Sequence, residues 1–351
     1  MNKIRTLVVD DSALMREILQ EILSQDPEIE VVGTASDPFQ AREKILRLNP
    51  DVLTLDVEMP RMDGLSFLEK LMRAHPMPVV MVSSLTKKGC ETAVRALELG
   101  AIDCVAKPRL DVRAGTMEQA DEIIHKVKAA AQAQLRRRNR PAVAPSAAVG
   151  HVAPQSALFN ATNKVVAIGA STGGTEALAE VLTSLPADAP GMVIVQHMPA
   201  GFTRAFAQRL DSICRVRVKE ARDGDPVLTG HALIAPGSFQ MSLVRSGAAN
   251  HVRVFPGEPV NHHRPSVDVL FEACAKELGS NAVGVIMTGM GADGARGLLA
   301  MRRAGAHTIA QDEATCVVFG MPGEAIAMGG AEEIKPLGEI ASAMLRAVVR
   351  S

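Results

Sequence analysis

The chain alternates short apolar runs with amphipathic helical segments, and it does so in two separate stretches. In its N-terminal third, β-branched runs such as Ile4–Val9 and Val52–Leu55 are followed by segments with apolar residues at helical spacing, such as Ala13–Ser24. Five such units end in a helix near Met117–Lys128. This alternation predicts a parallel sheet with helices on both faces, and therefore a (βα)5 domain.

A second α/β pattern begins at Lys164, after a segment rich in Ala, Pro, Gln and Ser. Its clearest strands are Met192–Gln196 and Ala282–Thr288, and residues 215–255 resemble short strands in hairpins at one edge. A helix is expected to begin with Ser266 as its N-cap. We therefore expect an α/β chain with two doubly wound domains and a linker, the second domain being larger and Rossmann-like, at residues 1–128, 129–163 (linker) and 164–351.

Composition argues against several classes of protein. The net charge is -1 and there is no Trp or Tyr, which disfavours nucleic-acid binding by a basic surface or by base stacking. The five cysteines include no CxxC pair, which disfavours a disulfide framework or a zinc site and suits a reducing compartment. No apolar stretch of about 18 residues is present, so membrane insertion is not expected. We expect a cytoplasmic monomer.

Charged residues follow three of the predicted strands in the first domain. Asp10 and Asp11 follow the first strand, Asp56 the third and Lys107 the fifth. The carboxyl ends of parallel strands lie at one edge of the sheet, so these side chains are expected to meet there. Three carboxylates suit the binding of Mg²⁺, and one of them remains able to attack phosphorus. A lysine nearby would balance the charge of the resulting acyl phosphate. Ser83, after the fourth strand, is placed to hydrogen-bond a phosphoryl oxygen. Each residue alone is equally a turn former or helix cap.

The motifs that contain these residues are specific. Val8–Ser12, Leu55–Gly64 and Ala106–Pro108 resemble a response-regulator receiver domain over about residues 1–125. One position departs from that pattern: receivers usually carry an aromatic switch residue three positions before the lysine, and here it is Cys104. An aromatic rotamer relay is therefore not expected in this chain.

The resemblance implies that a histidine kinase phosphorylates Asp56. It also implies that Ser83 and Lys107 contact the phosphoryl group. The implied Mg²⁺ ligands are Asp10 (through water), Asp11, Asp56 and the carbonyl of Glu58.

In the second domain, Gly169–Gly173 matches G-x-S-x-G between a strand and a helix, the context of a nucleophile elbow around Ser171. His197 and Asp293 follow other strands of the same predicted sheet, so a Ser-His-Asp triad is the favoured interpretation. Taken singly, these features are a phosphate-binding or packing turn, a structural histidine and a helix cap. The order Ser, His, Asp differs from that of the α/β-hydrolase fold.

The segments Ile168–Gly174, Val195–Met198 and Met287–Gly294 resemble the catalytic domain of the chemotaxis protein-glutamate methylesterase family, from about Lys164 to Leu345. The resemblance implies hydrolysis of glutamyl methyl esters on the cytoplasmic helices of chemoreceptors, with deamidation of receptor glutamines and no cofactor for the esterase. It also implies that the Met290 N–H stabilises the oxyanion and that Thr172 hydrogen-bonds His197. The stretch Asn261–Ser266 resembles a family segment near the pocket.

The sequence therefore favours an esterase that an unphosphorylated receiver covers and that phosphorylation of Asp56 releases. The alternative is a response regulator whose second domain only binds a partner, such as a nucleotide at Gly169–Gly174. The absence of G-x-G-x-x-G and of a P-loop lysine argues against that nucleotide. A DNA-binding output is weaker still, because the chain has no recognisable helix-turn-helix.

Overall fold

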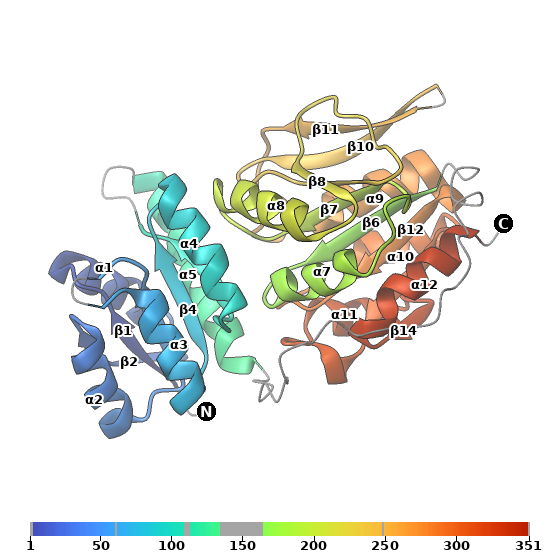
Figure 1. Ribbon diagram of the computed structural model, residues 1–351. Helices are drawn as coiled ribbons and strands as arrows, with labels where there is room; N and C mark the ends of the chain where they lie inside the picture. Colours follow the sequence, from blue (N-terminus) through green and yellow to red (C-terminus); the bar gives the residue numbers. More distant parts are fainter. Residues whose placement is uncertain (1–2, 60–61, 109–112, 134–163, 248, 350–351) are drawn as a thin grey trace.

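The computed structural model describes residues 3–59, 62–108, 113–133, 164–247 and 249–349. These residues form two α/β domains, joined through a segment outside the described ranges, and the predicted fold class is confirmed (Figure 1). The predicted linker begins four residues early, because the last helix of the first domain continues to Gln132. Within the described residues, no helix is both long and apolar enough to span a bilayer.

The N-terminal domain is a five-stranded parallel sheet with the strand order β2-β1-β3-β4-β5. Its elements are β1 (Ile4–Val9), α1 (Ala13–Ser24), β2 (Ile29–Ala35), α2 (Pro38–Leu48), β3 (Val52–Asp56), α3 (Gly64–Ala74), β4 (Val79–Ser83), α4 (Lys87–Glu98), β5 (Asp103–Ala106) and α5 (Arg113–Gln132).

Local sequence explains where these elements begin. Every residue of the central strands β3 and β4 is buried, as expected for strands covered on both faces, and so is every residue of the edge strand β5. The helices start at side-chain caps: the Asp37 carboxylate accepts from the N–H groups of Phe39 and Gln40, and the Thr86 hydroxyl accepts from Gly89. Each cap fixes the residue at which its helix begins. It thereby limits the length of the loop between strand and helix, and the charged residues lie at the edge of the sheet where these loops begin.

The C-terminal domain is a seven-stranded parallel sheet with the order β14-β13-β12-β6-β7-β9-β8, beside a two-stranded hairpin. Its elements are β6 (Val165–Ala170), α7 (Gly174–Thr183), β7 (Met192–Gln196), α8 (Phe202–Ile213), β8 (Arg217–Glu220), β9 (His231–Ile234), β10 (Gln240–Ser246), β11 (Ala249–Phe255), α9 (Val267–Leu278), η1 (Gly279–Asn281), β12 (Ala282–Ile286), α10 (Ala295–Arg303), β13 (His307–Gln311), η2 (Glu313–Thr315), α11 (Met321–Ala327), β14 (Glu333–Lys335) and α12 (Leu337–Val349).

The region 215–255 departs from the expected series of hairpins. Only β10 and β11 pair antiparallel, whereas β8 and β9 extend the main sheet in parallel. The connection between β8 and β9 instead pairs with β11, where the N–H groups of Gly224 and Val227 donate to the carbonyls of Val252 and Asn250. Turn residues identified the loops correctly but did not determine which strands pair.

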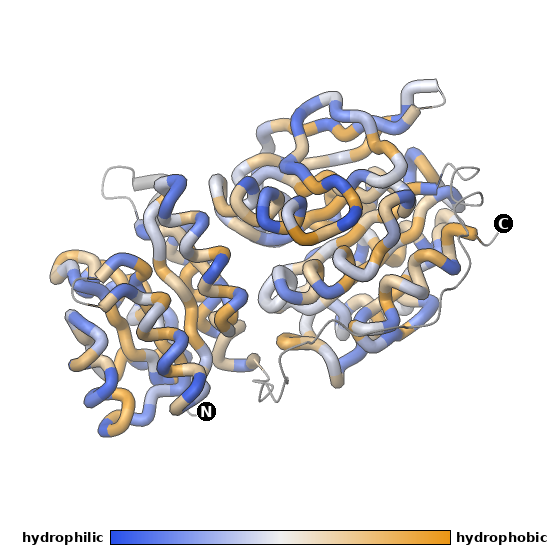
Figure 2. The backbone as a smooth tube through the Cα atoms, viewed as in Figure 1, coloured by the Kyte–Doolittle hydropathy of each residue, from blue (hydrophilic) through white to orange (hydrophobic). Residues whose placement is uncertain are grey.

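Apolar residues concentrate within each sheet and its helix layers, and polar residues lie on the outer helix faces (Figure 2). One apolar cluster includes residues of both domains, among them Leu97 of α4 and Phe206 of α8. Arg209 of α8 also forms an ion pair with Glu98 of α4. The side of the N-terminal domain that carries α4 and α5 therefore faces the C-terminal domain (Figure 1).

Helix α9 packs closely on α10 because Gly297 has no side chain. A Cβ there would lie 2.6 Å from Cβ of Phe271 and 3.2 Å from the backbone of Asp268. We expect Gly297→Ala to lower the free energy of unfolding by about 1–3 kcal/mol, because the two helices must move apart. Urea denaturation measures this.

Gly338→Ala is the matched control. Gly338 is an exposed helical residue whose added Cβ would meet nothing closer than 3.8 Å. It should leave stability unchanged or raise it by about 0.5–1 kcal/mol. Equal destabilisation by both substitutions would contradict the packing argument.

Candidate functional site

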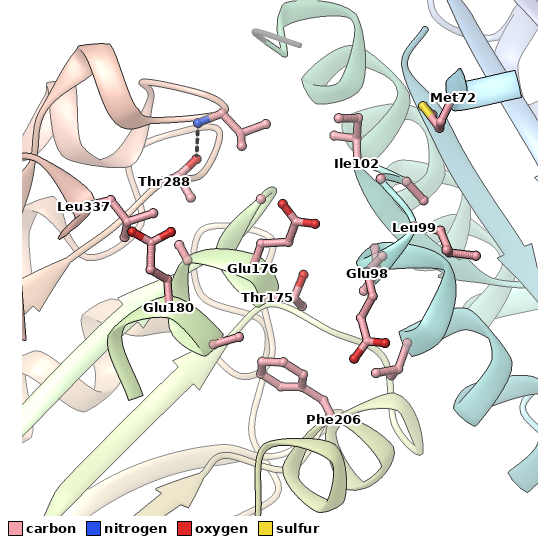
Figure 3. A pocket seen from close by; sticks show the side chains of 18 of the residues that line it. Met72, Glu98, Leu99, Ile102, Thr175, Glu176, Glu180, Phe206, Thr288 and Leu337 are labelled. Atoms are coloured by element: carbon pink, nitrogen blue, oxygen red, sulfur yellow. Dashed lines mark hydrogen bonds between the residues drawn. The ribbon is translucent and has the colours of Figure 1, made fainter. Parts of the chain in front are cut away.

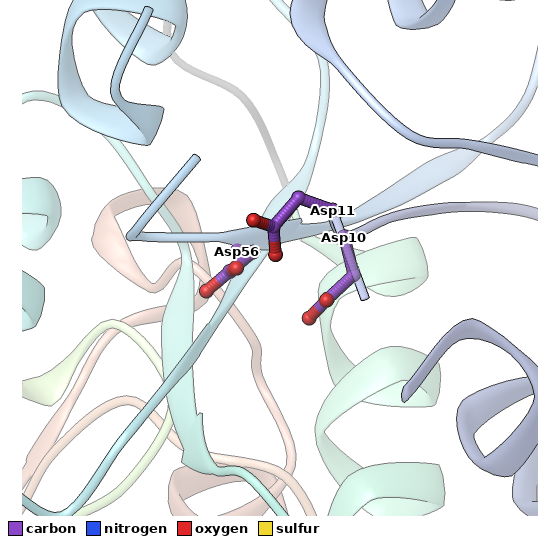
Figure 4. Close-up of side chains that lie close together, drawn as sticks. All are labelled: Asp10, Asp11 and Asp56. Carbon is purple, nitrogen blue, oxygen red and sulfur yellow. The ribbon is translucent and has the colours of Figure 1, made fainter. Parts of the chain in front are cut away.

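The first site is a cluster of carboxylates at the carboxyl edge of the N-terminal sheet. Asp10 and Asp11 follow β1, Asp56 ends β3, and single oxygens from the three side chains all lie within 4.8 Å of one another (Figure 4). Lys107, directly after β5, places Nζ 2.9 Å from Oδ2 of Asp10 and 2.9 Å from Oδ2 of Asp56. The structure thus brings together the four charged residues that the sequence predicted to meet.

Crowding makes this site unfavourable for negative charge. The pKa of Asp56 is raised to about 6, because burial and the nearby Asp10 carboxylate raise it and the Lys107 ammonium only partly opposes them. Three close carboxylate oxygens are hard donors of the kind Mg²⁺ prefers, and a bound dication would relieve their repulsion. The donor set therefore fits Mg²⁺, held by Asp11 and Asp56 with Asp10 behind them.

Three other predicted residues lie around this cluster. The Glu58 N–H donates to Oδ1 of Asp56 over 3.2 Å, so the loop that carries the Glu58 carbonyl folds over the carboxylate. Ser83 is buried, and its hydroxyl donates to the carbonyl of Gly89 in α4 over 3.0 Å. Cys104 is fully buried in β5, so a core thiol occupies the position where receivers usually have the aromatic switch residue.

The second site begins at Ser171, which follows β6 in a tight turn into α7. Gly173 adopts a φ of 77°, which favours glycine. A Cβ on Gly169 would lie 2.2 Å from a methyl carbon of Val267, so this glycine allows the start of α9 to approach the turn. The Ser171 hydroxyl is buried and has no hydrogen-bond partner among the described residues. The turn therefore presents an uncommitted hydroxyl.

His197 follows β7, which pairs with β6, and its Nε2 lies 2.8 Å from Oδ2 of Asp293. An ionised carboxylate only accepts hydrogen bonds, so Nε2 carries the proton and Nδ1 is left as an acceptor. Within the described part of the chain, Nδ1 is buried without a partner, as is the Ser171 hydroxyl. Those two atoms are the pair that a serine nucleophile and its general base must join.

Asp293 is held by five donors. Besides His197, it accepts from Asn261 Nδ2 at 2.7 Å and Ser266 Oγ at 2.7 Å, and from the N–H groups of Val267 at 2.6 Å and Asp268 at 3.3 Å. Burial alone would raise the pKa of this carboxyl, but the bonds from His197, Asn261 and Val267 lower it well below its usual range. Asp293 therefore remains ionised.

Asp293 also caps a helix, and that helix is α9 rather than α10, which follows Asp293 in the sequence. Ser266 occupies the N-cap position of α9, as predicted, yet its side chain makes no capping bond. Its hydroxyl donates to Asp293 instead, and that carboxylate caps the helix N–H groups from a distant loop. A sequence pattern identifies local caps, and it carries no signal for one supplied 26 residues away.

Thr172 does not hydrogen-bond His197 in this structure. Its hydroxyl donates to Oδ2 of Asp103, in β5 of the other domain, over 2.7 Å. Lys126 of α5 donates to the same Asp103 oxygen at 2.9 Å and to the carbonyl of His197 at 3.2 Å. We name Asp103 and Lys126 the interdomain pair, and sequence reasoning identified neither of them.

The interdomain pair is buried: Lys126 is only 2% exposed. Burial alone would lower its pKa, but the Asp103 carboxylate outweighs burial and raises it. Lys126 therefore remains charged, and the pair lies directly against Thr172 and the carbonyl of His197. The only feature of the sequence that pointed to this pair was a lysine within the apolar face of a predicted helix.

Two further histidines lie at this contact. His263 stacks on His197, with ring centroids 3.7 Å apart and planes 15° apart. His125 of α5 meets His263 edge-on at 5.4 Å. The sequence placed His263 in a segment near the pocket and gave His125 no partner.

The predicted oxyanion donor, Met290, lies in the loop after β12, where the Gly289 carbonyl accepts from the N–H groups of Gly320 and Met321.

A cleft of about 1230 Å³ separates the domains beside this contact. Glu98 and Leu99 line it from one side, and Glu176 and Phe206 line it from the other (Figure 3). Ser171, His197 and Asp293 are not among its lining residues. It is therefore a gap between the domains and not the reaction site.

Comparisons with known proteins match both domains. Residues 166–344 match the CheB methylesterase family model, and residues 6–114 match the response regulator receiver domain model. A protein-glutamate methylesterase/protein-glutamine glutaminase of Bordetella parapertussis is 60% identical over 98% of this chain and 97% of its own length. The enzyme of that name from Salmonella typhimurium is 57% identical over the same shares. The crystal structure of the Thermotoga maritima CheB methylesterase catalytic domain is 40% identical, with a TM-score of 0.52, over 53% of this chain and 98% of that one.

The raised pKa of Asp56 predicts how stability depends on pH. Because the folded-state pKa is about 6 and the usual value is 3.8, ionising Asp56 lowers stability as the pH rises between these two values, and the full cost is present above them. In chelator, Asp56→Asn should therefore raise the free energy of unfolding at pH 8 by on the order of 2 kcal/mol, and the gain should shrink toward pH 5. Urea denaturation at the two pH values measures the difference.

Asp63→Asn is the control of opposite sign, because the Ser66 N–H lowers the pKa of that helix cap. It should give no gain at pH 8. A wild type more stable than Asp56→Asn at pH 8 without metal would overturn the electrostatic account of the cluster.

Proposed function

Since this chain belongs to the CheB methylesterase family, and is thus a hydrolase with a receiver domain, we propose that phosphorylation of Asp56 switches on its methylesterase activity. The substrates are glutamyl methyl esters and glutamine amides on the cytoplasmic helices of chemoreceptors, and a histidine kinase supplies the phosphoryl group. This places the enzyme in the cytoplasm, as a monomer. The interdomain pair against the triad is the observation that carries the proposal.

The triad geometry supports an acyl-transfer reaction. Ser171 Oγ attacks the ester carbonyl while His197 Nδ1 takes its proton, and Asp293 stabilises the resulting imidazolium through Nε2. In this proposal the Met290 N–H stabilises the oxyanion. When the tetrahedral intermediate collapses, the ester C–O bond breaks, the His197 imidazolium gives its proton to the departing methoxide oxygen, and methanol leaves an acyl-enzyme on Ser171. Water then attacks the acyl carbon while His197 takes its proton, and the proton passes to Ser171 Oγ as glutamate is released. With a glutamine substrate the leaving group is ammonia.

The carboxylate cluster supports phosphoryl transfer to Asp56. When bound, Mg²⁺ supplies charge neutralisation of the phosphoryl oxygens. The residues that would hold it are Asp11, Asp56 and the Glu58 carbonyl, with Asp10 acting through water. Lys107 lies 2.9 Å from the attacking carboxylate and is placed to pair with the acyl phosphate. The Ser83 hydroxyl reaches that phosphate only after leaving the Gly89 carbonyl, which couples the phosphate to α4.

The closed arrangement opposes esterase activity in two ways. Ser171 and His197 are 1% and 4% exposed in this arrangement, and the receiver contacts their neighbourhood through the His197 carbonyl and Thr172, so a receptor helix has no access to them. It also holds the Thr172 hydroxyl on Asp103, away from His197. Separation of the domains exposes the serine and frees that hydroxyl. Strand β5 spans both events, because Asp103 starts it and Lys107 follows it.

The chemistry and its control are tested together by methanol release from methylated receptor fragments, with and without Mg²⁺ and a small phosphodonor. We expect stimulation in the wild type and only basal release in Asp56→Ala. Ser171→Ala should lose at least about 10⁴-fold, because a triad without its nucleophile retains only binding and oxyanion contributions. Retained release in Ser171→Ala would favour the non-enzymatic binding module instead.

The interdomain pair holds the enzyme closed in this proposal, so variants that lack the pair should be constitutively active. Breaking a buried ion pair leaves the other charge unpaired and costs about 3–5 kcal/mol, but only in the closed state, where the pair is dry. Lys126→Met and Asp103→Asn should therefore raise unstimulated methanol release at least about tenfold and reduce the stimulation by phosphodonor.

The matched control is Lys128→Met on the same helix. Lys128 pairs with Asp26 and Glu28 inside the receiver and does not face the triad. Its basal release should stay within about twofold of wild type. A Lys126→Met enzyme that is as silent as wild type without phosphodonor would remove the pair from the mechanism.

A further inference from the structure

The imidazole of His197 is held by a hydrogen bond at one nitrogen and by a ring contact on one face. The bond from Nε2 to Asp293 fixes that atom but leaves the ring free to tilt about it. The parallel ring of His263, 3.7 Å away, opposes that tilt. We propose that His263 is a positioning residue that sets the plane of His197, so that Nδ1 remains directed at Ser171 during acyl transfer.

The backbone before His263 is arranged for this contact. Asn261 and His262 both have positive φ, 52° and 66°, which residues other than glycine rarely adopt. Reciprocal backbone bonds between Val260 and His263 close the turn, and the Asn261 side chain ties it to Asp268 and Asp293. Such strain persists where surrounding contacts determine it, and it concentrates at functional sites.

The chemistry of the stack suits a general base that becomes charged. Burial and the neighbouring His197 hold the pKa of His263 below its usual range, so its ring is neutral at neutral pH. The charged or titratable groups around it are His197, Asp293, His125 and Lys126. A neutral ring face tolerates the imidazolium that forms on His197, whereas a second cation would repel it.

The geometry disfavours two other roles for the histidine group. Metal ligation requires ring nitrogens that converge on one point, but the rings of His197 and His263 lie nearly parallel. Among the described residues, the metal-type cluster is Asp10, Asp11 and Asp56, and no histidine belongs to it. A direct substrate contact by the nitrogens of His263 predicts a different kinetic outcome, which the experiment separates.

The test uses the full chain and methanol release from methylated receptor fragments, and it rests on the proposed triad. We expect His263→Ala to lower kcat by about 10–100-fold with KM nearly unchanged, because a misaligned base slows the chemical step. His263→Phe should keep kcat within about threefold of wild type, since a flat apolar ring preserves the contact. His262→Asn is the control: it alters the exposed neighbour in the same left-handed turn and should change neither constant.

The outcomes are distinguishable. Equal losses in His263→Phe and His263→Ala would show that the ring nitrogens act chemically and would overturn the positioning role. A raised KM at unchanged kcat would show substrate contact, with the same consequence, and wild-type kcat in His263→Ala would dismiss the ring contact. Thermal unfolding of both variants checks the fold, and His263→Phe keeps the test valid if His263→Ala does not fold. Retained activity in Ser171→Ala would refute the triad itself, independently of His263.

Discussion

The ionised carboxylate of Asp293 is the acceptor on which the geometry of the active site depends. Three separate parts of the chain converge on it: His197 after β7, the turn at Asn261, and the first N–H groups of α9. Each contact requires negative charge on Asp293, and together they make protonation unfavourable. The close approach of α9 depends in turn on Gly169, where a side chain would collide with Val267. Gly169 in the turn at Ser171 and the negative charge on Asp293 are therefore parts of one arrangement.

The domain contact is built on a different principle. A charged pair buried between two domains gains little net free energy, because both ions lose their hydration. Its effect is directional: beyond their bond to each other, Asp103 accepts from Thr172 and Lys126 donates to the His197 carbonyl only when the two domains meet. Apolar contacts between α4 and α8 supply the buried area of the interface, and the ion pair fixes how the two domains align. An interface of that kind is specific and yet separable in water.

The sequence predicted the parts that repeat local rules. Strand ends located Asp56, Lys107, Ser171, His197 and Asp293, because parallel sheets bring the ends of their strands to one edge. It did not locate what depends on contacts between distant segments. Asp103 and Lys126 are ordinary residues of β5 and α5 until a second domain covers them, and His263 gains its neighbour only through a strained turn. Pairing in the region after α8 was also missed, since turn residues do not determine which strand a segment joins.

Strand β5 is short enough to make the proposed control of this enzyme reciprocal. Its four residues separate Asp103 from Lys107 by roughly 13 Å, so the proposed phosphorylation site and the domain contact share one rigid segment. By linkage, whatever factor phosphorylation contributes to opening, opening contributes to phosphorylation. In the proposed mechanism, a substrate that occupies the serine site keeps the domains apart, and it thereby favours the phosphorylated receiver. Substrate abundance would therefore adjust how much of the enzyme carries the phosphoryl group.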